Sequence, residues 1–143
     1  EQGYLRLNRK AAKPPKPMQP FHFVSSDGLD IFVGRNNKQN DQLTLKFAEK
    51  SDIWLHTQQV HGAHVILVTN GTAPPDRSLE EAAMLAAYHS KGRDSAQVKV
   101  DYCMAKFVKK PAGARPGMVI YTNYQTAFVT PDAALCEKLR VTE

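Results

Sequence analysis

The chain has 143 residues, a hydrophobic fraction of 42% and a formal net charge of +5. This length suits one domain with its own core rather than two. No apolar run approaches the roughly 20 residues of a membrane-spanning helix, and the first residues lack a signal-peptide pattern. The two cysteines, Cys103 and Cys136, fit neither a metal motif nor a disulfide framework, which favours a reducing compartment.

Residues 1–20 are predicted to be a lead-in to the folded part. The Pro-rich, basic run over residues 11–17 prefers extended polyproline geometry. Because the chain begins with Glu1 rather than a methionine, we expect a piece of a longer protein. The folded domain is predicted to span residues 21–143.

The domain is predicted to open with a hairpin and a helix. Strands over residues 21–24 and 30–33 flank an Asp-Gly turn at Gly28. A helix over residues 36–48 follows, with an asparagine as its N-cap.

The middle of the chain predicts two strands and a second helix. Residues 53–57 form a short strand, and residues 63–69 form a central one because they are apolar almost throughout. Ser78 and Glu81 have the spacing of a capping box. The helix that they begin is predicted to end near residues 91–92.

The last third predicts more strands. Residues 98–102 and 105–108 form two of them, residues 118–121 and 126–130 pair as a hairpin, and a short helix covers residues 132–139. Since strands outnumber helices and most neighbours are hairpin-linked, the fold class is α+β, with a largely antiparallel β-sheet, two main helices and a short C-terminal helix.

Amide and cationic side chains gather where the second strand leads into the first helix. Amides both donate and accept hydrogen bonds, so they suit recognition of a polar partner. The candidate binding residues here are Arg35, Asn36, Asn37, Lys38, Gln39 and Asn40. Asn36 and Asn40 share the inward helix face with Leu43. These two amides either brace neighbouring loops or line a concave site that an outside group completes.

The strand over residues 53–57 carries a second candidate surface. Trp54 and His56 share one strand face, and His64 follows on the next strand. We expect an aromatic and hydrogen-bonding platform for unstacked RNA bases, extended by tyrosines. The alternative is that Trp54 packs in the core. The tyrosines that could extend the platform are Tyr102, Tyr121 and Tyr124.

Residues 91–115 form a basic segment, with seven basic and two acidic side chains and a local charge of +5. Uneven positive charge favours a polyanion as partner, and an ordinary solvated face is the alternative. On a strand, Lys106 and Lys110 would point the same way. The candidate phosphate-binding residues are Lys106, Lys109, Lys110 and Arg115.

Catalytic patterns are absent from the sequence. It holds no P-loop, no GxGxxG and no GxSxG motif, and its acidic residues are dispersed. We therefore expect no enzymatic activity and no cofactor. Three histidines, His56, His61 and His64, lie within nine residues, but no Cys or HExxH pattern accompanies them. Hydrogen-bonding roles are favoured over a metal site, with a metal-dependent hydrolase as the alternative.

Several short motifs occur in order along the domain. They are Gly34-Arg35-Asn36-Asn37-Lys38-Gln39-Asn40-Asp41, Asp52-Ile53-Trp54-Leu55-His56, Gly62-Ala63-His64-Val65, Glu81-Ala82-Ala83, Val100-Asp101-Tyr102 and Lys109-Lys110-Pro111. Through them, residues 21–131 resemble the NFACT-R domain of the RqcH / FbpA / NEMF family.

This resemblance implies an RNA-binding accessory domain of a cytoplasmic ribosome quality control factor. Such factors bind obstructed large ribosomal subunits with peptidyl-tRNA and promote C-terminal alanine tailing of the nascent chain. The implied partners are tRNA, large-subunit RNA and other domains of the full-length protein, with no membrane. The lead-in would be the exit from a preceding coiled coil. A fibronectin-binding surface adhesin is the alternative, because some family members carry that name.

Overall fold

A β-hairpin begins the folded part. The computed structural model describes residues 19–141, and its first strands, β1 (Phe21–Val24) and β2 (Asp30–Val33), pair antiparallel. Gly28 turns the chain between them with a φ of 87°, a conformation that residues with a Cβ rarely adopt. The predicted hairpin is thus confirmed, whereas the predicted lead-in lies almost wholly outside the described residues.

Six strands form one sheet in the order β1-β2-β4-β3-β5-β8, and every neighbouring pair is antiparallel. The four strands that complete it are β3 (Ile53–Thr57), β4 (Val65–Leu67), β5 (Val98–Met104) and β8 (Gln125–Val129). The predicted α+β class is confirmed. The predicted central strand is also found, since β4 lies between β2 and β3.

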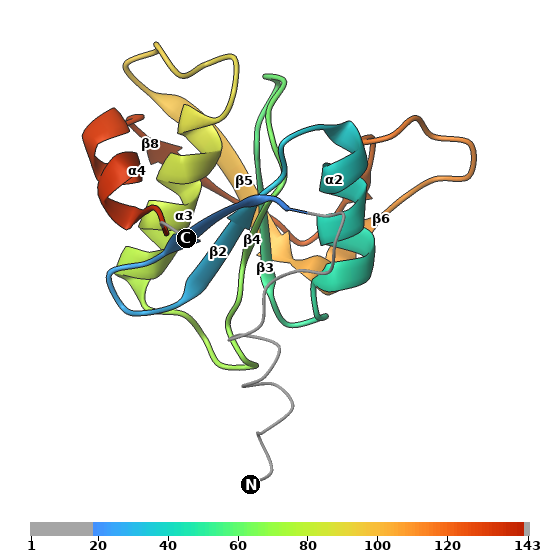
Figure 1. Cartoon of the computed structure of the whole chain (residues 1–143). Coiled ribbons are helices and arrows are strands. Elements are labelled where there is room, and N and C mark those ends of the chain that lie inside the picture. Colours follow the sequence, from blue (N-terminus) through green and yellow to red (C-terminus); the bar gives the residue numbers. More distant parts are fainter. Residues whose placement is uncertain (1–18, 142–143) are drawn as a thin grey trace, which may run out of the picture.

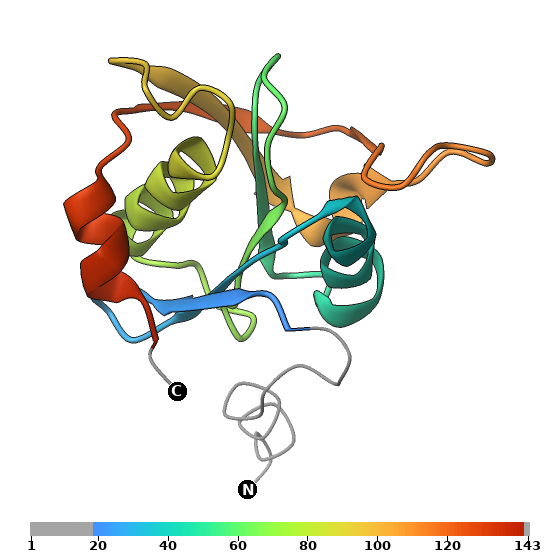
Figure 2. The same cartoon turned by 45° about the horizontal axis from the view of Figure 1, so that its top comes forward.

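Helices cover both faces of this sheet (Figures 1 and 2). On one face lie α3 (Asp76–Tyr88) and α4 (Ala133–Leu139). On the other lie α2 (Asn37–Asp41) and η1 (Gln42–Phe47), a π-helix that continues α2 directly. No helix within residues 19–141 combines the length and the apolar character that crossing a bilayer requires.

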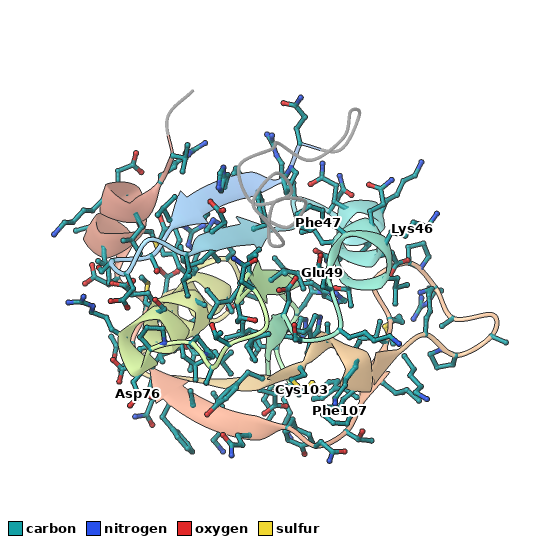
Figure 3. All side chains as sticks on the ribbon, turned by 90° about the horizontal axis from the view of Figure 1, so that it is seen from below. Lys46, Phe47, Glu49, Asp76, Cys103 and Phe107 are labelled. Atoms are coloured by element: carbon teal, nitrogen blue, oxygen red, sulfur yellow. The ribbon has the colours of Figure 1, made fainter. Side chains whose placement is uncertain are left out.

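Because strand side chains alternate between faces, the sheet has two hydrophobic cores. Leu55 packs with the α3 residues in the larger core, and its neighbour Trp54 packs on the other side with Leu43 of η1. The second core also holds Cys103, with Phe47 and Phe107 packed against it (Figure 3). A layer of apolar side chains therefore separates η1 from the sheet, and that layer contains Trp54.

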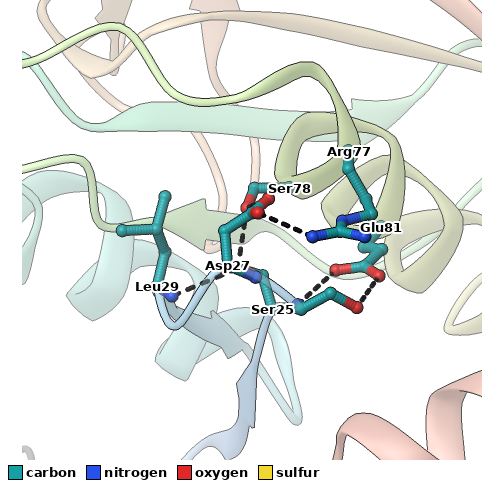
Figure 4. A network of polar contacts seen from close by, with 7 residues as sticks. Ser25, Asp27, Leu29, Arg77, Ser78 and Glu81 are labelled. Carbon is teal, nitrogen blue, oxygen red and sulfur yellow. Dashed lines mark hydrogen bonds and ion pairs between the residues drawn. The ribbon is translucent and has the colours of Figure 1, made fainter.

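The predicted start of α3 is wrong. The helix begins at Asp76, and Ser78 and Glu81 bind the β1–β2 turn instead of capping their own helix (Figure 4). Glu81 Oε1 accepts from the Ser26 backbone N–H at 2.7 Å, and Ser78 Oγ lies 2.7 Å from Ser25 Oγ. The two residues predicted to cap α3 therefore hold the β1–β2 turn against the helix instead. The helix ends at Tyr88, before the predicted residues 91–92.

Two predictions near the end of the chain are also wrong. The stretch predicted as a strand over residues 105–108 is a 3₁₀ turn, η2 (Ala105–Phe107), followed by β6 (Val108–Lys109). The predicted hairpin of residues 118–121 with 126–130 does not form. Instead β7 (Ile120–Tyr121) pairs with β6, and β8 pairs with β5. Asn123, with a φ of 54°, redirects the chain between the two sheets.

Candidate nucleic-acid interface

The amide segment after β2 is held in place by its own hydrogen bonds. Asn36 caps α2, because its Oδ1 accepts from the Gln39 backbone N–H at 2.9 Å. Gln39 reciprocates, since its Oε1 accepts from the Arg35 N–H at 2.9 Å. The first bond satisfies a donor that the helix start leaves free, and the second fixes the residue before the cap. Among these residues, the side chains of Arg35, Asn36, Asn37 and Lys38 are exposed.

Asn40 braces the fold. Its side chain is buried, with an exposed fraction of 3%, and its Oδ1 accepts from the His64 backbone N–H at 3.1 Å. Gly34 N–H donates to the His64 carbonyl at 3.0 Å. A Cβ built on Gly34 would lie 2.0 Å from Asn40 Oδ1, so any other residue there would displace this hydrogen-bonded amide. The sequence left two roles open for Asn40, bracing neighbouring loops or lining a concave site. These bonds give it the bracing role.

The predicted aromatic platform is wrong. Trp54 is fully buried, and it lies against Tyr121 at 4.6 Å and against His64 at 5.3 Å between ring centroids. His56 stacks on Trp54 and is only half-buried. The Trp54 face of β3 is covered by η1 and by β7, so these rings form a core rather than an open surface for bases.

His64 is a buried, neutral connector between elements. Its Nε2 lies 3.1 Å from the Gly117 carbonyl, which only accepts, so Nε2 carries the proton. Nδ1 then accepts from the Thr44 hydroxyl at 2.7 Å. Burial, and after it the neighbouring His56, lowers the pKa of His64 to about 3. The ring thus joins η1 to the loop that precedes β7 without carrying charge.

The buried carboxylate of Asp101 connects β5 to neighbouring strands. Its Oδ2 accepts from the Tyr121 hydroxyl at 2.6 Å, and its Oδ1 accepts from Thr126 Oγ1 at 2.7 Å and from Gln58 Nε2 at 3.0 Å. Burial, together with this bond to Asp101, raises the pKa of Tyr121. The carboxylate therefore joins β5 to β7 and β8.

The two predicted binding segments lie side by side. Residues 110–118 project beside α2 in Figures 1 and 2, and Asp41 joins the two segments. Asp41 Oδ1 accepts from the Gly117 N–H at 3.0 Å, and Oδ2 pairs with Lys110 Nζ at 3.3 Å. Lys110 Nζ also donates to the carbonyls of Arg115 and Met118 at 2.6 and 3.2 Å. Lys110 thus shapes this loop from within.

The structure divides the predicted site residues by exposure. Exposed side chains belong to Arg35, Asn36, Asn37, Lys38, Lys106, Lys109 and Arg115. Partly buried ones belong to Gln39, His56 and Lys110. Buried ones belong to Asn40, Trp54 and His64. The predicted alignment of Lys106 with Lys110 along one strand is wrong, since Lys106 lies in the η2 turn.

A cleft of about 300 Å³ opens beside the start of α2. It is lined by Phe21, Gly34, Arg35, Asn36, Asn37, Asn40, His61, Gly62, Ala63, His89, Ser90, Lys91 and Arg93. Lys91 and Arg93 belong to the predicted basic segment but are not among the predicted site residues. Their proximity to Arg35 arises from the tertiary fold, so local charge density was the only signal available in the sequence.

Comparisons with known proteins agree with one another. A family model described as "NFACT protein RNA binding domain" matches residues 19–123. The Rqc2 homolog RqcH of Bacillus subtilis is 46% identical over 98% of this chain and 25% of its own length. The ribosome quality control complex subunit NEMF of Homo sapiens is 32% identical over 51% of this chain and 7% of its own.

A solved structure is also similar. It is the C-terminal part of the fibronectin/fibrinogen-binding protein from Streptococcus suis, with a TM-score of 0.84 and 40% identity over 91% of this chain and 52% of that chain. The present chain spans about a quarter of the length of the bacterial relatives that it matches.

Proposed function

This chain belongs to the family of NFACT protein RNA-binding domains, and from that membership we propose that it binds RNA as one domain of a ribosome quality control factor. Its RNA partners in this proposal are tRNA and the RNA of the large ribosomal subunit, and it works in the cytoplasm beside other domains of the same protein. The domain supplies contacts and no chemistry of its own, and alanine tailing belongs to the whole factor acting on the ribosome.

One observation carries the proposal, namely the exposed cations on the side formed by α2 and residues 106–118. Arg35, Lys38, Lys109 and Arg115 are exposed there. Within residues 19–141 none of the four forms an ion pair with a carboxylate, and Asp41 of α2 pairs with Lys110. Cations that remain free on a fixed surface are suited to phosphate contacts along an RNA backbone.

Fluorescence anisotropy with labelled tRNA at increasing KCl tests this proposal. Log affinity should fall linearly with log salt, with a slope of about −0.7 to −0.9 for each phosphate contacted. The double variant Lys38→Gln/Lys109→Gln should bind more weakly and with a flatter slope. The charge-matched control Lys99→Gln/Lys138→Gln changes exposed lysines of β5 and α4 and should bind like the unchanged chain. Equal loss in both variants, or binding that ignores salt, would contradict the proposal.

Fibronectin binding is the second candidate function, favoured by the name of the Streptococcus suis protein whose structure is similar. Surface plasmon resonance with immobilised fibronectin separates the two candidates. Saturable binding that survives Lys38→Gln/Lys109→Gln, together with no affinity for tRNA, would favour the adhesin function over the RNA-binding one.

A further inference from the structure

The cleft beside α2 has a floor fixed by backbone hydrogen bonds. The segment after α3 runs antiparallel to the loop after β3, with Lys91 N–H donating to the His61 carbonyl at 2.9 Å and an isolated bridge between Gly62 and Ser90. A Cβ on Gly62 would lie 2.9 Å from the Ser90 Cβ, so the close approach depends on glycine. The cleft is therefore a preformed feature of the fold.

Three cations reach this cleft from two separate segments of the chain. Arg35 follows β2, whereas Lys91 and Arg93 follow α3. The lining contains no Asp or Glu among the described residues. Within residues 19–141, none of the three cations forms an ion pair with a carboxylate. The positive charge of the cleft is thus left for an anion from outside the chain.

Both arginines lie over aromatic rings. The Arg93 guanidinium carbon is 4.0 Å from the centroid of Tyr88, and that of Arg35 is 4.8 Å from the centroid of Phe21. Contact with a ring face holds a guanidinium while its N–H groups point outward in their own plane. Arg35 uses one of its five N–H groups on the Gln19 carbonyl, at 3.3 Å. The remaining groups can donate to phosphate oxygens.

The size and the rim of the cleft indicate which anion it takes. A volume of about 300 Å³ is at the lower end of small-molecule sites and fits one nucleotide unit better than a duplex. Asn36 at the rim uses its Oδ1 in the helix cap, which leaves its amide NH₂ group to donate to a ribose or a base. The neighbouring Asn37 is exposed and can both donate and accept.

We propose that this cleft holds one phosphorylated nucleotide unit of a single-stranded RNA segment, with Arg35, Lys91 and Arg93 on the phosphate and the two asparagines at its rim. The proposal rests on the proposed function, since it assigns a place to RNA that the domain binds. It adds a specific site to the exposed cations of α2 and residues 106–118.

Amide NMR of the ¹⁵N-labelled chain tests the location. Titration with a single-stranded uridine hexanucleotide should shift the amides of residues 61–63 and 90–93 in one saturable process. Adenosine monophosphate should shift the same amides with at least tenfold weaker affinity, because it lacks the neighbouring phosphates of a strand. Hexaglutamate, an acidic peptide with as many units as the hexanucleotide, should leave them unshifted.

A matched pair of variants tests the residues. Lys91→Gln/Arg93→Gln should weaken hexanucleotide binding by at least about tenfold, because two charged hydrogen-bonding partners of the phosphate are lost, and should flatten its salt slope by about 0.7, the value for one phosphate contact. Lys99→Gln/Lys138→Gln removes the same charge elsewhere and should bind the hexanucleotide like the unchanged chain. Unchanged amide spectra outside the substituted positions confirm that both variants are folded.

Other results would separate an error in the cleft assignment from an error in the proposed RNA binding. If tRNA and the hexanucleotide bind the unchanged chain but the cleft amides do not shift, the cleft assignment is wrong and RNA binding stands. If neither RNA binds, the proposed function itself fails. Adenosine monophosphate binding as tightly as the hexanucleotide would make the ligand a free nucleotide, and equally tight binding of hexaglutamate would make it an acidic peptide.

Discussion

At the scale of single residues, His64 determines how three segments meet. Its backbone binds Gly34 and Asn40, and its ring binds Thr44 and Gly117. The two ring contacts together require a neutral imidazole, which donates at one nitrogen and accepts at the other. A residue that sequence reasoning assigned to RNA is thus a structural connector beneath the surface that the RNA would meet.

The pKa of His64 predicts a loss of stability in mild acid. Its folded-state pKa of about 3 lies below the unfolded value of 6.5, so the unfolded chain binds the proton more readily. The His64 contribution is complete above pH 6.5 and declines as the pH falls towards 3. Between pH 7 and pH 5 we expect a loss of about 2 kcal/mol from this residue. His56 and His89, whose pKa values burial also lowers, act in the same direction.

Urea unfolding followed by Trp54 fluorescence at pH 7 and pH 5 measures this loss. The variant His64→Gln should be less stable at pH 7 and should show a smaller difference between the two pH values. If His64→Gln loses as much unfolding free energy between pH 7 and pH 5 as the unchanged chain does, groups other than His64 cause the acid sensitivity.

Gly34 gives a second prediction at this scale. Gly34→Ala places a methyl group on Asn40 Oδ1 and should cost about 3 kcal/mol, through overpacking and the displaced bond to His64. Thermal unfolding by circular dichroism measures it. Gly92→Ala is the matched control, because its Cβ would meet its nearest neighbour at 3.4 Å. The double variant Gly34→Ala/Asn40→Ala should lose less stability than the two single variants together. The reason is that alanine at position 40 lacks the amide oxygen that the new methyl group would overlap.

At the scale of elements, α2 and the loop over residues 110–118 form one unit through Asp41. The ion pair with Lys110 and the bond to the Gly117 N–H hold the loop against the helix. Two adjacent lysines consequently have different surroundings. Lys110 is turned inward to Asp41 and to loop carbonyls, while Lys109 is exposed.

Lys109 and Lys110 should therefore respond differently to the same substitution. Lys109→Gln is expected to weaken tRNA binding and to flatten its salt slope by about 0.7 to 0.9, with unfolding unchanged. Lys110→Gln is expected to cost up to about 1 kcal/mol of stability, as for a partly exposed ion pair, and to speed amide hydrogen exchange at Gly117. Identical effects on RNA binding and exchange would contradict this division.

At the scale of the whole molecule, Arg35 connects the two groups of cations assigned to RNA, since it lies next to α2 and also lines the cleft. Residues 110–118 project beside α2 at the α2 end of the molecule, whereas α4 lies on the other face of the sheet (Figures 1 and 2). Because two hydrophobic cores fix the helices to opposite faces of the sheet, these two sides keep their separation. RNA should therefore approach from the α2 end.

Crosslinking on ribosomes tests this orientation. In cells that express the full-length protein, ultraviolet crosslinks between RNA and the domain should fall on residues 35–38, 91–93 and 106–115. Residues 125–140 of β8 and α4 are the internal control and should carry few crosslinks. A concentration of crosslinks on that control segment would reverse the proposed orientation.

The sequence alone determined part of the local structure. The Asp-Gly turn, the strands at 21–24, 30–33 and 53–57, the Asn36 cap and the short last helix depend on neighbouring residues, and they form as predicted. The α+β class and the family followed from the same patterns and motifs. Local propensity and side-chain alternation are properties of adjacent residues, so one sequence is sufficient to show them.

Only the tertiary structure decided which face of each element meets solvent. Alternation along β3 separated Trp54 from Leu55, but both faces of the central strands are covered, so the pattern did not distinguish a core from a platform. Ser78 and Glu81 have capping spacing yet bind a turn more than fifty residues away. Lys91 and Arg93 line one cleft with Arg35, although they follow α3 and Arg35 follows β2. Such contacts join residues distant in sequence, and folding alone brings them together.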